Sequence, residues 1–480
     1  MQVSRGAAVI DRSIACPLYS AAETVPDAPF LIDDDCVFSY SDFSELVDCV
    51  VKDLIDRYID QGDRLAFRAP NNAVSLATIW ACFRLRVIAC PISTRVPHST
   101  AQQMADQISG ILIEPLASAK PNQPSAHNAP VTVSPDDYAT IIFSSGSTGT
   151  PKAVVHKLQA HFASARASNK RIPLAESDRW LLLLPVYHVG GLAIVFRCVL
   201  SRAAVVIPSP KKEVEDSIIA NSVTHLSLVA TQLKRILAAN PESLRRCKAV
   251  LVGGGPIPRE LALQATLQNV PLHVTYGMSE FASQVATSPR LLPDELANDD
   301  GHNVMAGNAL SHAQIAIASD GEILVRGESL MEGYWRRDAS GSSCDTGVDS
   351  EGWYHTNDMG TLDEFGRLSV LGRKDNMFIS GGENIHPEEI EAAIMTMSEV
   401  RQALVVAVPN GEYGHRPIAF VDSSASFDAS RIRDHLMRHL PRFKIPDSFL
   451  AWPKQAIGSM KPSRAQFRQL AVDQLQHGQK

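Results

Sequence analysis

The sequence lacks any pair of closely spaced cysteines. Its eight cysteines contain no C-x-x-C spacing, which is typical of zinc sites, and their scatter suggests no disulfide framework. They are Cys16, Cys36, Cys49, Cys82, Cys90, Cys198, Cys247 and Cys344. Reduced thiols in a cytoplasm fit this usage best.

Long hydrophobic runs are also missing. The N-terminal stretch MQVSRGAAVIDR has a run of only five small and apolar residues before Asp11, which is too short for a signal peptide. Longer stretches, such as LATIWACF, end at Arg84 and Arg86 well before the length that crosses a membrane. We therefore expect a cytoplasmic protein without a membrane span.

An excess of basic residues is absent too. Among 480 residues, 45 are Lys or Arg and 52 are Asp or Glu, so the net charge of −7 argues against a nucleic-acid partner. With 45% hydrophobic and 20% charged residues, the chain has the composition of a globular protein long enough for two or more domains. These numbers do not distinguish a monomer from a homo-oligomer.

Apolar strands alternate with helical segments from about residue 136 to 290, beginning with the strand YATIIF, a loop and a helix. This alternation predicts an α/β fold with a parallel sheet covered on both faces. The first 115 residues show a weaker form of the pattern.

Two later segments follow other patterns. Residues 300–372 contain short strands with DG and FG pairs, which predict hairpins in a small antiparallel barrel or sheet. The C-terminal segment alternates helices with a hairpin and a strand, which predicts a compact α+β domain. We therefore divide the chain into an N-terminal domain at residues 1–372, a hinge at residues 373–376 and a C-terminal domain at residues 377–480.

The stretch SSGSTGTPK, residues 144–152, directly follows a predicted strand. Its small residues leave backbone N–H groups and hydroxyls free to surround phosphate oxygens, and Lys152 adds a positive charge. It is not a Walker loop, because Pro151 precedes the lysine and Ala153 follows it. VGGGPIP fails as a Rossmann loop, since Pro258 stands where the third glycine belongs. The alternative for residues 144–152 is a plain surface turn.

Several motifs resemble those of the adenylate-forming enzymes, which include acyl- and aryl-CoA ligases, and they occur in that family's order. They are SSGSTGTPK at 144–152, GGGP at 253–256, YGMSE at 276–280, HTND at 355–358, GRKDN at 372–376 and SGGENIHPEEIE at 380–391. The resemblance implies a large N-terminal domain of parallel α/β subdomains with a small β-barrel, and a smaller, mobile C-terminal domain. It also implies ATP, Mg²⁺ and coenzyme A, because such enzymes adenylate a carboxylic acid and pass the acyl group to a thiol.

The same resemblance assigns residues to ATP. Glu280 corresponds to the magnesium ligand, and a carboxylate suits a hard cation that bridges phosphates. Asp358 and Arg373 correspond to the ribose contacts, although Asn357 replaces the glycine usual before that aspartate, which leaves the local backbone geometry open. The full ATP set is Ser144, Ser145, Gly146, Ser147, Thr148, Gly149, Lys152, Gly254, Gly255, Tyr276, Gly277, Ser279, Asp358 and Arg373.

In the C-terminal segment, Lys461 corresponds to the catalytic lysine, although the family's usual Gly-Lys pair is absent and Ser459 follows Gly458. Asp375 corresponds to the hinge on which the small domain rotates. Gly381, Gly382 and Glu383 would then line the channel for coenzyme A. The alternatives are that Lys461 is a surface lysine, that Asp358 and Arg373 are salt-bridge partners in the hinge region, and that SGGENIHPEE is an ordinary helix start.

The stretch LPVYHVGGL contains no aspartate for a substrate ammonium, which argues against an amino-acid substrate. His188 would gate or contact the substrate carboxylate as a catalytic and substrate-binding residue, and Gly254 would border the substrate; an ordinary loop histidine is the alternative. Arg197 lies in the apolar helix GLAIVFRCVL, where a buried guanidinium requires an anion. That anion is either a protein carboxylate or a second carboxylate on the substrate.

Further stretches, including VYHVGGLAIVFR, YGMSEFASQVAT and MKPSR, resemble the o-succinylbenzoate–CoA ligase branch of menaquinone biosynthesis. This resemblance favours the substrate carboxylate as the partner of Arg197. The open alternatives are a ligase for another aryl or acyl acid, a loader of a carrier protein and a non-catalytic nucleotide-binding protein.

Overall fold

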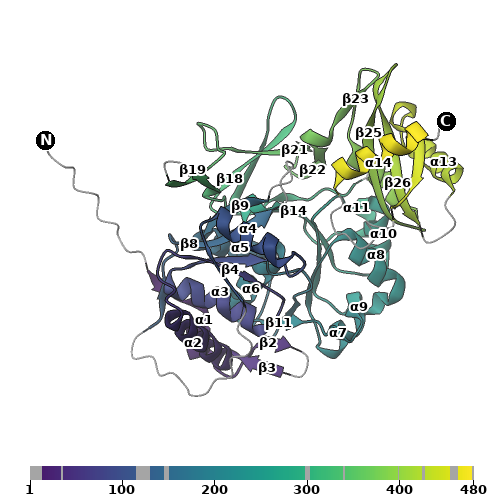
Figure 1. Ribbon diagram of the computed structural model, residues 1–480. Coiled ribbons are helices and arrows are strands. Elements are labelled where there is room, and N and C mark those ends of the chain that lie inside the picture. The colour runs from purple at the N-terminus through teal and green to yellow at the C-terminus, as the bar shows by residue number, and fades with distance from the viewer. Residues whose placement is uncertain are drawn as a thin grey trace.

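The computed structural model describes residues 13–33, 36–114, 130–144, 151–297, 303–338, 341–397, 399–423, 428–453 and 463–477. Figure 1 shows a larger lobe that contains most of the chain and a smaller C-terminal lobe, coloured light green to yellow, on one side of it. This mixed α/β architecture in two parts confirms the predicted fold class.

The largest sheet has nine strands in the order β16-β15-β14-β13-β12-β10-β11-β2-β3. Its strands are β2 (Pro29–Asp33), β3 (Cys36–Ser39), β10 (Arg179–Leu181), β11 (Ala204–Ile207), β12 (His225–Leu228), β13 (Ala249–Val252), β14 (Leu272–Met278), β15 (Ser283–Thr287) and β16 (Asn308–Ala309). The run from β14 to β2 is parallel, and antiparallel strands flank it at both edges. Fully buried strands such as Ala249–Val252 explain the continuous apolar runs of this segment.

A second sheet has seven strands in the order β20-β19-β9-β8-β5-β4-β6. Its strands are β4 (Arg64–Arg68), β5 (Ile88–Ile92), β6 (Ile111–Ile113), β8 (Tyr138–Ser144), β9 (Lys152–Lys157), β19 (Gly333–Asp338) and β20 (Gly341–Asp345). The expectation of a helix directly after the 144–152 loop is wrong, because the antiparallel strand β9 comes first. Four residues of this strand, Ala153–His156, are buried within the sheet. The chain therefore continues as a strand before the helix α5 (Leu158–Arg171) begins.

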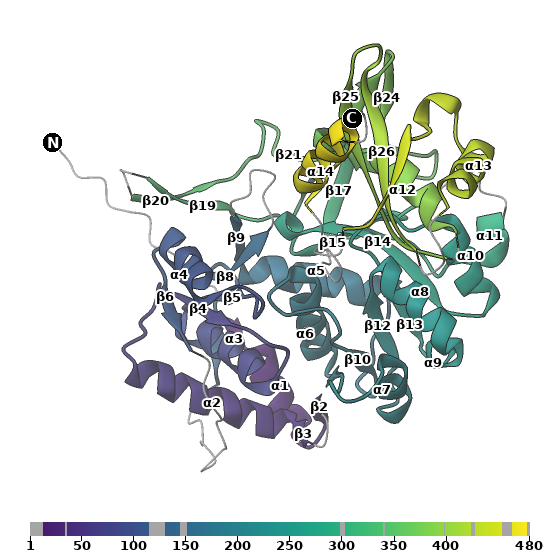
Figure 2. The ribbon, with the colours of Figure 1, turned by 45° about the vertical axis from the view of Figure 1, so that its right-hand side comes forward.

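The helices of the larger lobe and one short strand pair complete that part of the fold. They are α1 (Pro17–Thr24), α2 (Tyr40–Asp56), α3 (Ala73–Leu85), α4 (His98–Gln107), α6 (Val189–Ser201), α7 (Val214–Ala220), α8 (Ala230–Ala239), α9 (Pro241–Arg245), α10 (Arg259–Leu267) and α11 (Pro293–Ala297), with β1 (Ile14–Ala15) paired to β7 (Thr132–Val133). Figure 2 shows α5 and α6 between the two sheets.

Helix α6 is apolar around nearly its whole circumference, so it is buried on nearly every side, as that pattern predicts. Its Phe196 ring lies 5.6 Å from Trp80 of α3 and 5.7 Å from Phe162 of α5, measured between ring centroids. The aromatic cluster therefore ties three helices together around the helix that carries Arg197.

Residues 313–373 contain a four-stranded antiparallel sheet of β17 (Ala313–Ile317), β18 (Glu322–Gly327), β21 (Tyr354–Leu362) and β22 (Leu368–Arg373). The predicted hairpins are confirmed: Gly321 and Gly366 lie in the connecting turns with φ of +86° and +73°, which glycine adopts without a steric penalty. A small barrel and a sheet are the two forms expected for this segment, and the described strands pair as an open sheet.

The smaller lobe combines one sheet with three helices. It contains β23 (Phe378–Ser380), β24 (Glu383–Ile385), β25 (Val400–Asn410), β26 (Gly414–Ser423) and β27 (Ser448–Ala451), with α12 (Pro387–Met395), α13 (Ala429–His439) and α14 (Arg464–His477). Pro387 occupies the first turn of α12 with Glu388 and Glu389, as the sequence predicts. No helix in the described ranges is long and apolar enough to cross a membrane.

One lysine of the larger lobe contacts the smaller lobe. The Nζ atom of Lys234, on α8, donates hydrogen bonds to the carbonyl oxygens of Met395, Met397 and Val400 at 3.3, 2.9 and 2.6 Å. These carbonyls lie at the C-terminal end of α12 and beyond it, where the helix dipole favours a cation. The contact ties α8 to the end of α12.

Three buried histidines predict an acid-sensitive fold. Burial lowers the pKa of His156, His225 and His312 to about 4, whereas unfolded histidines titrate near 6.5. Between these values the unfolded chain binds protons that the folded chain does not. The stability is therefore fully present above pH 6.5 and is lost as the pH falls toward 4, by up to about 3 kcal/mol for each histidine.

Urea unfolding between pH 7.5 and 4.5 measures this loss. His225→Gln should flatten the pH dependence of the unfolding free energy, while the same change at exposed His98 should leave it unaltered. A pH dependence that is equal in wild type and His225→Gln would contradict the assignment.

Candidate active site

The predicted phosphate loop joins two paired strands. Ser144 ends β8, Lys152 begins β9, and the two residues face each other across the ladder. The hydroxyl of Ser144 is buried and has no hydrogen-bond partner among the described residues, so it is available to a ligand. The remaining predicted loop residues, Ser145, Gly146, Ser147, Thr148 and Gly149, lie outside the described residues.

Glu280 lies in the short helix η1 (Ser279–Phe281), directly after β14. The hydroxyl of Tyr334 donates to its Oε1 atom at 2.8 Å, and the hydroxyls of Tyr334 and Tyr354 lie 2.8 Å apart. The Nζ atom of Lys152 lies 4.9 Å from the centre of the Tyr334 ring, within range of a cation–π contact. Tyr334 thus links the candidate metal ligand to the lysine of the phosphate loop.

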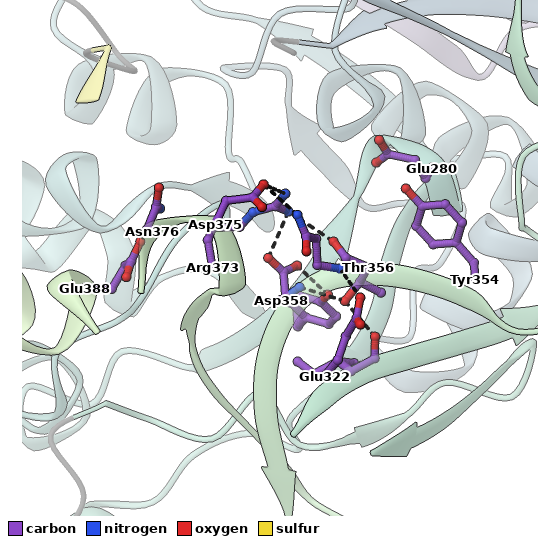
Figure 3. A network of polar contacts seen from close by, with 12 residues as sticks. Glu280, Glu322, Tyr354, Thr356, Asp358, Arg373, Asp375, Asn376 and Glu388 are labelled. Carbon is purple, nitrogen blue, oxygen red and sulfur yellow. Dashed lines mark hydrogen bonds and ion pairs between the residues drawn. The ribbon is translucent and has the colours of Figure 1, made fainter. Parts of the chain in front are cut away.

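These residues fit a magnesium ion that a nucleotide brings with it. No cluster of three or more His, Cys, Asp or Glu side chains among the described residues could hold a metal alone. Magnesium commonly binds one or two protein carboxylates together with substrate phosphates. Glu280, fixed by Tyr334, supplies such a carboxylate, which stands beside Tyr354 in Figure 3.

Asp358 and Arg373, the predicted ribose contacts, face each other across β21 and β22. Asp358 accepts hydrogen bonds from the Tyr276 hydroxyl at 2.7 Å and from Arg373 Nη1 at 3.0 Å, as Figure 3 shows for the arginine. Burial raises the pKa of Asp358, and these two donors oppose that rise. The structure therefore brings three of the predicted ATP residues together.

Asn357, which stands where the family has glycine, keeps a left-handed backbone with φ of +63°. Asparagine tolerates this conformation better than other residues with a side chain. Its N–H donates to Glu322 at 2.8 Å, and its Nδ2 donates to Asp375 at 2.6 Å. The replacement thus retains the turn and adds a contact to the predicted hinge residue, which lies in η2 (Lys374–Asn376).

Two of the three predicted glycines near β13 and β14, Gly254 and Gly277, occupy places that a side chain would disturb. Gly254 has φ of +81°, and a Cβ at Gly277 would lie 2.0 Å from the Ser283 carbonyl oxygen. Gly255 follows Gly254 after β13 and would meet nothing within 4 Å. The register of β14 and β15 shifts between Tyr276 and Gly277, and the absence of a side chain at Gly277 allows the two strands to approach closely beside Ser279 and Glu280.

A buried chain of hydrogen bonds supports the turn that carries Ser279 and Glu280. His156 Nε2 lies 2.7 Å from the Ser279 carbonyl oxygen, and Thr140 Oγ1 lies 3.3 Å from His156 Nδ1 and 2.9 Å from His161 Nε2. Because a carbonyl only accepts, Nε2 of His156 must carry its proton and Nδ1 must accept one from Thr140. The ring of His161 stacks on Phe196, at 4.8 Å between centroids, which connects this chain to α6.

Arg197 is only 1% exposed. Its Nη2 donates to Gln284 Oε1 at 2.6 Å and lies 3.5 Å from Ser283 Oγ, and its guanidinium lies 5.1 Å from the centre of the Trp180 ring. Its Nε is buried without a hydrogen-bond partner, and none of the described carboxylates forms an ion pair with it. Burial lowers its pKa to about 10, so the side chain stays charged at neutral pH.

His188 lies at the N-terminal end of α6, the helix that carries Arg197. Its side chain is exposed, and its ring lies 4.8 Å from that of Tyr187. A Cβ at Gly191 would lie 2.2 Å from the Pro185 carbonyl oxygen, so the close return of the chain at this helix start requires glycine.

The remaining predictions fall in the smaller lobe. Gly381 and Gly382 form the turn between β23 and β24, with φ of +60° and +89°, and exposed Glu383 begins β24. Lys461 lies outside the described residues. Arg464, three residues later, donates to Glu391 at 2.5 Å and to Glu388 at 3.2 Å, which anchors the start of α14 to α12.

Sequence reasoning assigned no role to Tyr334, Tyr354, His156 or Gln284. Tyr334 stands in the stretch EGYW and Gln284 in ASQVAT, where nothing in the local pattern marks either side chain. Their partners lie 54 and 87 positions away in the sequence, at Glu280 and Arg197. Such pairs arise only from the order of strands and helices in the fold.

Two family descriptions match the chain. Residues 109–335 match the AMP-binding enzyme family, and residues 389–458 match the AMP-binding enzyme C-terminal domain. The 2-succinylbenzoate–CoA ligase of Salmonella typhimurium is 34% identical over 92% of this chain and 94% of its own.

Solved structures agree with these matches. The o-succinylbenzoate CoA synthetase of Bacillus subtilis in complex with the acyl-adenylate intermediate OSB-AMP superposes with a TM-score of 0.83 at 28% identity, over 95% of this chain and 98% of that one. The same enzyme in complex with ATP and magnesium gives 0.82 at 27% identity, over 95% and 99%. The chain therefore belongs to the AMP-binding enzyme family.

Proposed function

We propose that this protein is an AMP-forming ligase that joins 2-succinylbenzoate to coenzyme A in menaquinone biosynthesis. A carboxylate oxygen of the acid attacks the α-phosphorus of ATP, and the bond to pyrophosphate breaks. The sulfur of coenzyme A, after losing its proton, then attacks the acyl carbon, and AMP leaves. The similarity to 2-succinylbenzoate–CoA ligases over nearly the whole chain supports this reaction.

The nucleotide would lie between the phosphate loop and the four-stranded sheet. Ser144 and Lys152 would contact the departing phosphates, while Asp358 would accept from the ribose hydroxyls beside Tyr276 and Arg373. Glu280 would hold magnesium, which neutralises phosphate charge when bound. Fixed donors and charges of this kind stabilise the transition state because they need no reorganisation during the reaction.

The observation that carries the proposed substrate is the surroundings of Arg197. A guanidinium at 1% exposure is costly unless an anion accompanies it, and the described protein residues supply only neutral partners. A second carboxylate on the substrate would provide the missing charge, and Arg–carboxylate pairs can form two parallel hydrogen bonds. This favours a dicarboxylic acid over a monocarboxylic one.

The C-terminal residues would act by moving. With residues 1–372 and 377–480 as the two domains and 373–376 as the hinge, Asp375 would turn the small domain between the two half-reactions. Lys461 would neutralise charge during adenylation, and Gly381, Gly382 and Glu383 would line the path of the thiol. The φ angles of Gly381 and Gly382 are both positive, and a turn of two such glycines suits a close approach of backbone to ligand.

Thioester formation by the full-length protein tests the proposal. With ATP, Mg²⁺ and coenzyme A, we expect a higher kcat/KM for 2-succinylbenzoate than for 4-oxo-4-phenylbutanoate or 2-butanoylbenzoate, each of which lacks one of its carboxylates. In a parallel reaction, a carrier protein replaces coenzyme A as the acceptor of the acyl group. A preference for either monocarboxylic acid, or for the carrier, would overturn the proposed reaction.

A further inference from the structure

Gln284 is the nearest polar partner of Arg197 among the described side chains, and it carries no charge. It lies on β15, is 2% exposed, and accepts from Arg197 Nη2 at 2.6 Å through its amide oxygen. Glutamate has nearly the same size and would place a carboxylate at this point, as buried arginines usually require. With glutamine the guanidinium is held while its charge stays uncompensated.

The fold fixes the orientation of this amide. Gln284 Nε2 donates to Thr287 Oγ1 at 2.8 Å and lies 3.4 Å from Thr275 Oγ1. Thr275 donates to the Ala286 carbonyl oxygen at 2.8 Å and lies 2.9 Å from Thr287 Oγ1, so both threonine oxygens are able to accept. A flipped amide would set its NH₂ group against the guanidinium, donor against donor. The two threonines thus keep the oxygen facing Arg197.

The other neighbours of the guanidinium among the described residues are neutral as well. They are the Ser283 hydroxyl at 3.5 Å and the face of Trp180, whose Nε1 donates to Ser227 at 3.1 Å. The guanidinium Nε remains buried and without a partner. No ion pair of Arg197 occurs within the described ranges, so the positive charge is unmatched there.

Gln284 also places Arg197 close to the nucleotide-binding residues. It pairs with Gly277 in the ladder between β14 and β15, and these two strands enclose the turn with Ser279 and Glu280. The two strands approach so closely at this point that a Cβ at Gly277 would clash with the Ser283 carbonyl oxygen. The unmatched charge therefore lies against the hairpin whose connection carries the candidate metal ligand.

We propose that Gln284 is a specificity-determining positioning residue, which orients Arg197 without cancelling its charge and so reserves that charge for the second carboxylate of the substrate. The inference rests on the proposed function and adds to it the reason why a dicarboxylic acid is selected. A carboxylate at position 284 would form an ion pair with the Arg197 guanidinium within the protein. The substrate carboxylate would then have no unmatched charge to meet.

The substitution Gln284→Glu tests this in the full-length enzyme. We expect kcat/KM for 2-succinylbenzoate to fall roughly 10- to 150-fold, the range for loss of a charge-assisted hydrogen bond. The kcat/KM of a monocarboxylic analogue that forms a thioester should stay within about threefold, because such an analogue uses its one carboxylate in the reaction and presents none to Arg197. Gln264→Glu, at an exposed position of α10, is the matched control and should change none of these values.

Two further variants separate charge from packing. Gln284→Leu removes the acceptor but leaves the charge unmatched, so it should harm use of 2-succinylbenzoate less than Gln284→Glu does. Thr287→Val frees the Gln284 amide and should selectively lower kcat/KM for the dicarboxylic acid. This variant also provides the test if thermal melting shows that Gln284→Glu does not fold. Equal losses on all three acids in Gln284→Glu and Thr287→Val, or a larger loss in Gln284→Leu, would overturn the role of Gln284. Failure of the proposed function itself is distinct, since the wild type would then form no thioester from 2-succinylbenzoate.

Discussion

The variant Arg197→Ala is expected to lower kcat/KM for 2-succinylbenzoate by about 30-fold or more, since removing one partner of a buried charge pair costs roughly 2–5 kcal/mol. The KM for ATP should change little, because the described contacts of Arg197 involve Gln284, Ser283 and Trp180 and none of the predicted nucleotide residues. Steady-state kinetics of thioester formation, with each substrate varied in turn, measures both values.

The control for this variant is Arg235→Ala, which removes an exposed arginine from α8 and should leave the kinetics unaltered. The two monocarboxylic analogues provide the second comparison, because they have no second carboxylate to lose a contact. If Arg197→Ala weakened the use of these analogues as much as that of 2-succinylbenzoate, Arg197 would have a structural role and the proposed substrate would lose its main support.

Glu280→Gln should have a comparably large effect, with a loss of at least about 100-fold in activity at low Mg²⁺ that excess Mg²⁺ partly restores. The amide keeps the size of the side chain but removes the charge that attracts the cation. Tyr334→Phe should act less strongly, by about 10- to 100-fold in apparent Mg²⁺ affinity, since the hydroxyl only orients the carboxylate.

Pyrophosphate release titrated with MgCl₂ measures these shifts. Tyr58→Phe, which alters a tyrosine that is 87% exposed, is the matched control for Tyr334→Phe. A Mg²⁺ dependence that is the same in Glu280→Gln and wild type would remove Glu280 from the metal site. A Tyr334→Phe enzyme with an unchanged Mg²⁺ dependence would limit Tyr334 to packing.

The sequence predicted those parts of the fold that depend on local pattern. The apolar periodicity around Arg197 indicated a buried helix, and the DG and FG pairs indicated hairpins. The strand β9 was missed because its buried residues resemble the start of the helix that follows. Its identity depends on pairing with β8 and β19, and that pairing is a property of the sheet.

The candidate site shows the same division. Asp358 and Glu280 were predicted from their motifs, and the structure brings Asp358 to Tyr276 and Arg373. Tyr334 could not be found this way, because its role depends on meeting a residue of another sheet. The open question at Asn357 concerned its local backbone geometry. The positive φ answers this question, since asparagine occupies the left-handed region that glycine would have used.

The contact of Lys234 has a consequence for any swivelling of the small lobe. Its ammonium group donates to three carbonyl oxygens from the end of α12 to the start of β25, and it has no other hydrogen-bond partner among the described residues, so it caps that helix and also joins the lobes. A rotation that pulls these surfaces apart must return the ammonium group and the carbonyls to water together. The contacts of Lys234 thus stabilise the orientation of the small lobe that is described here. Neutralising this single amine would weaken that stabilisation without touching the nucleotide.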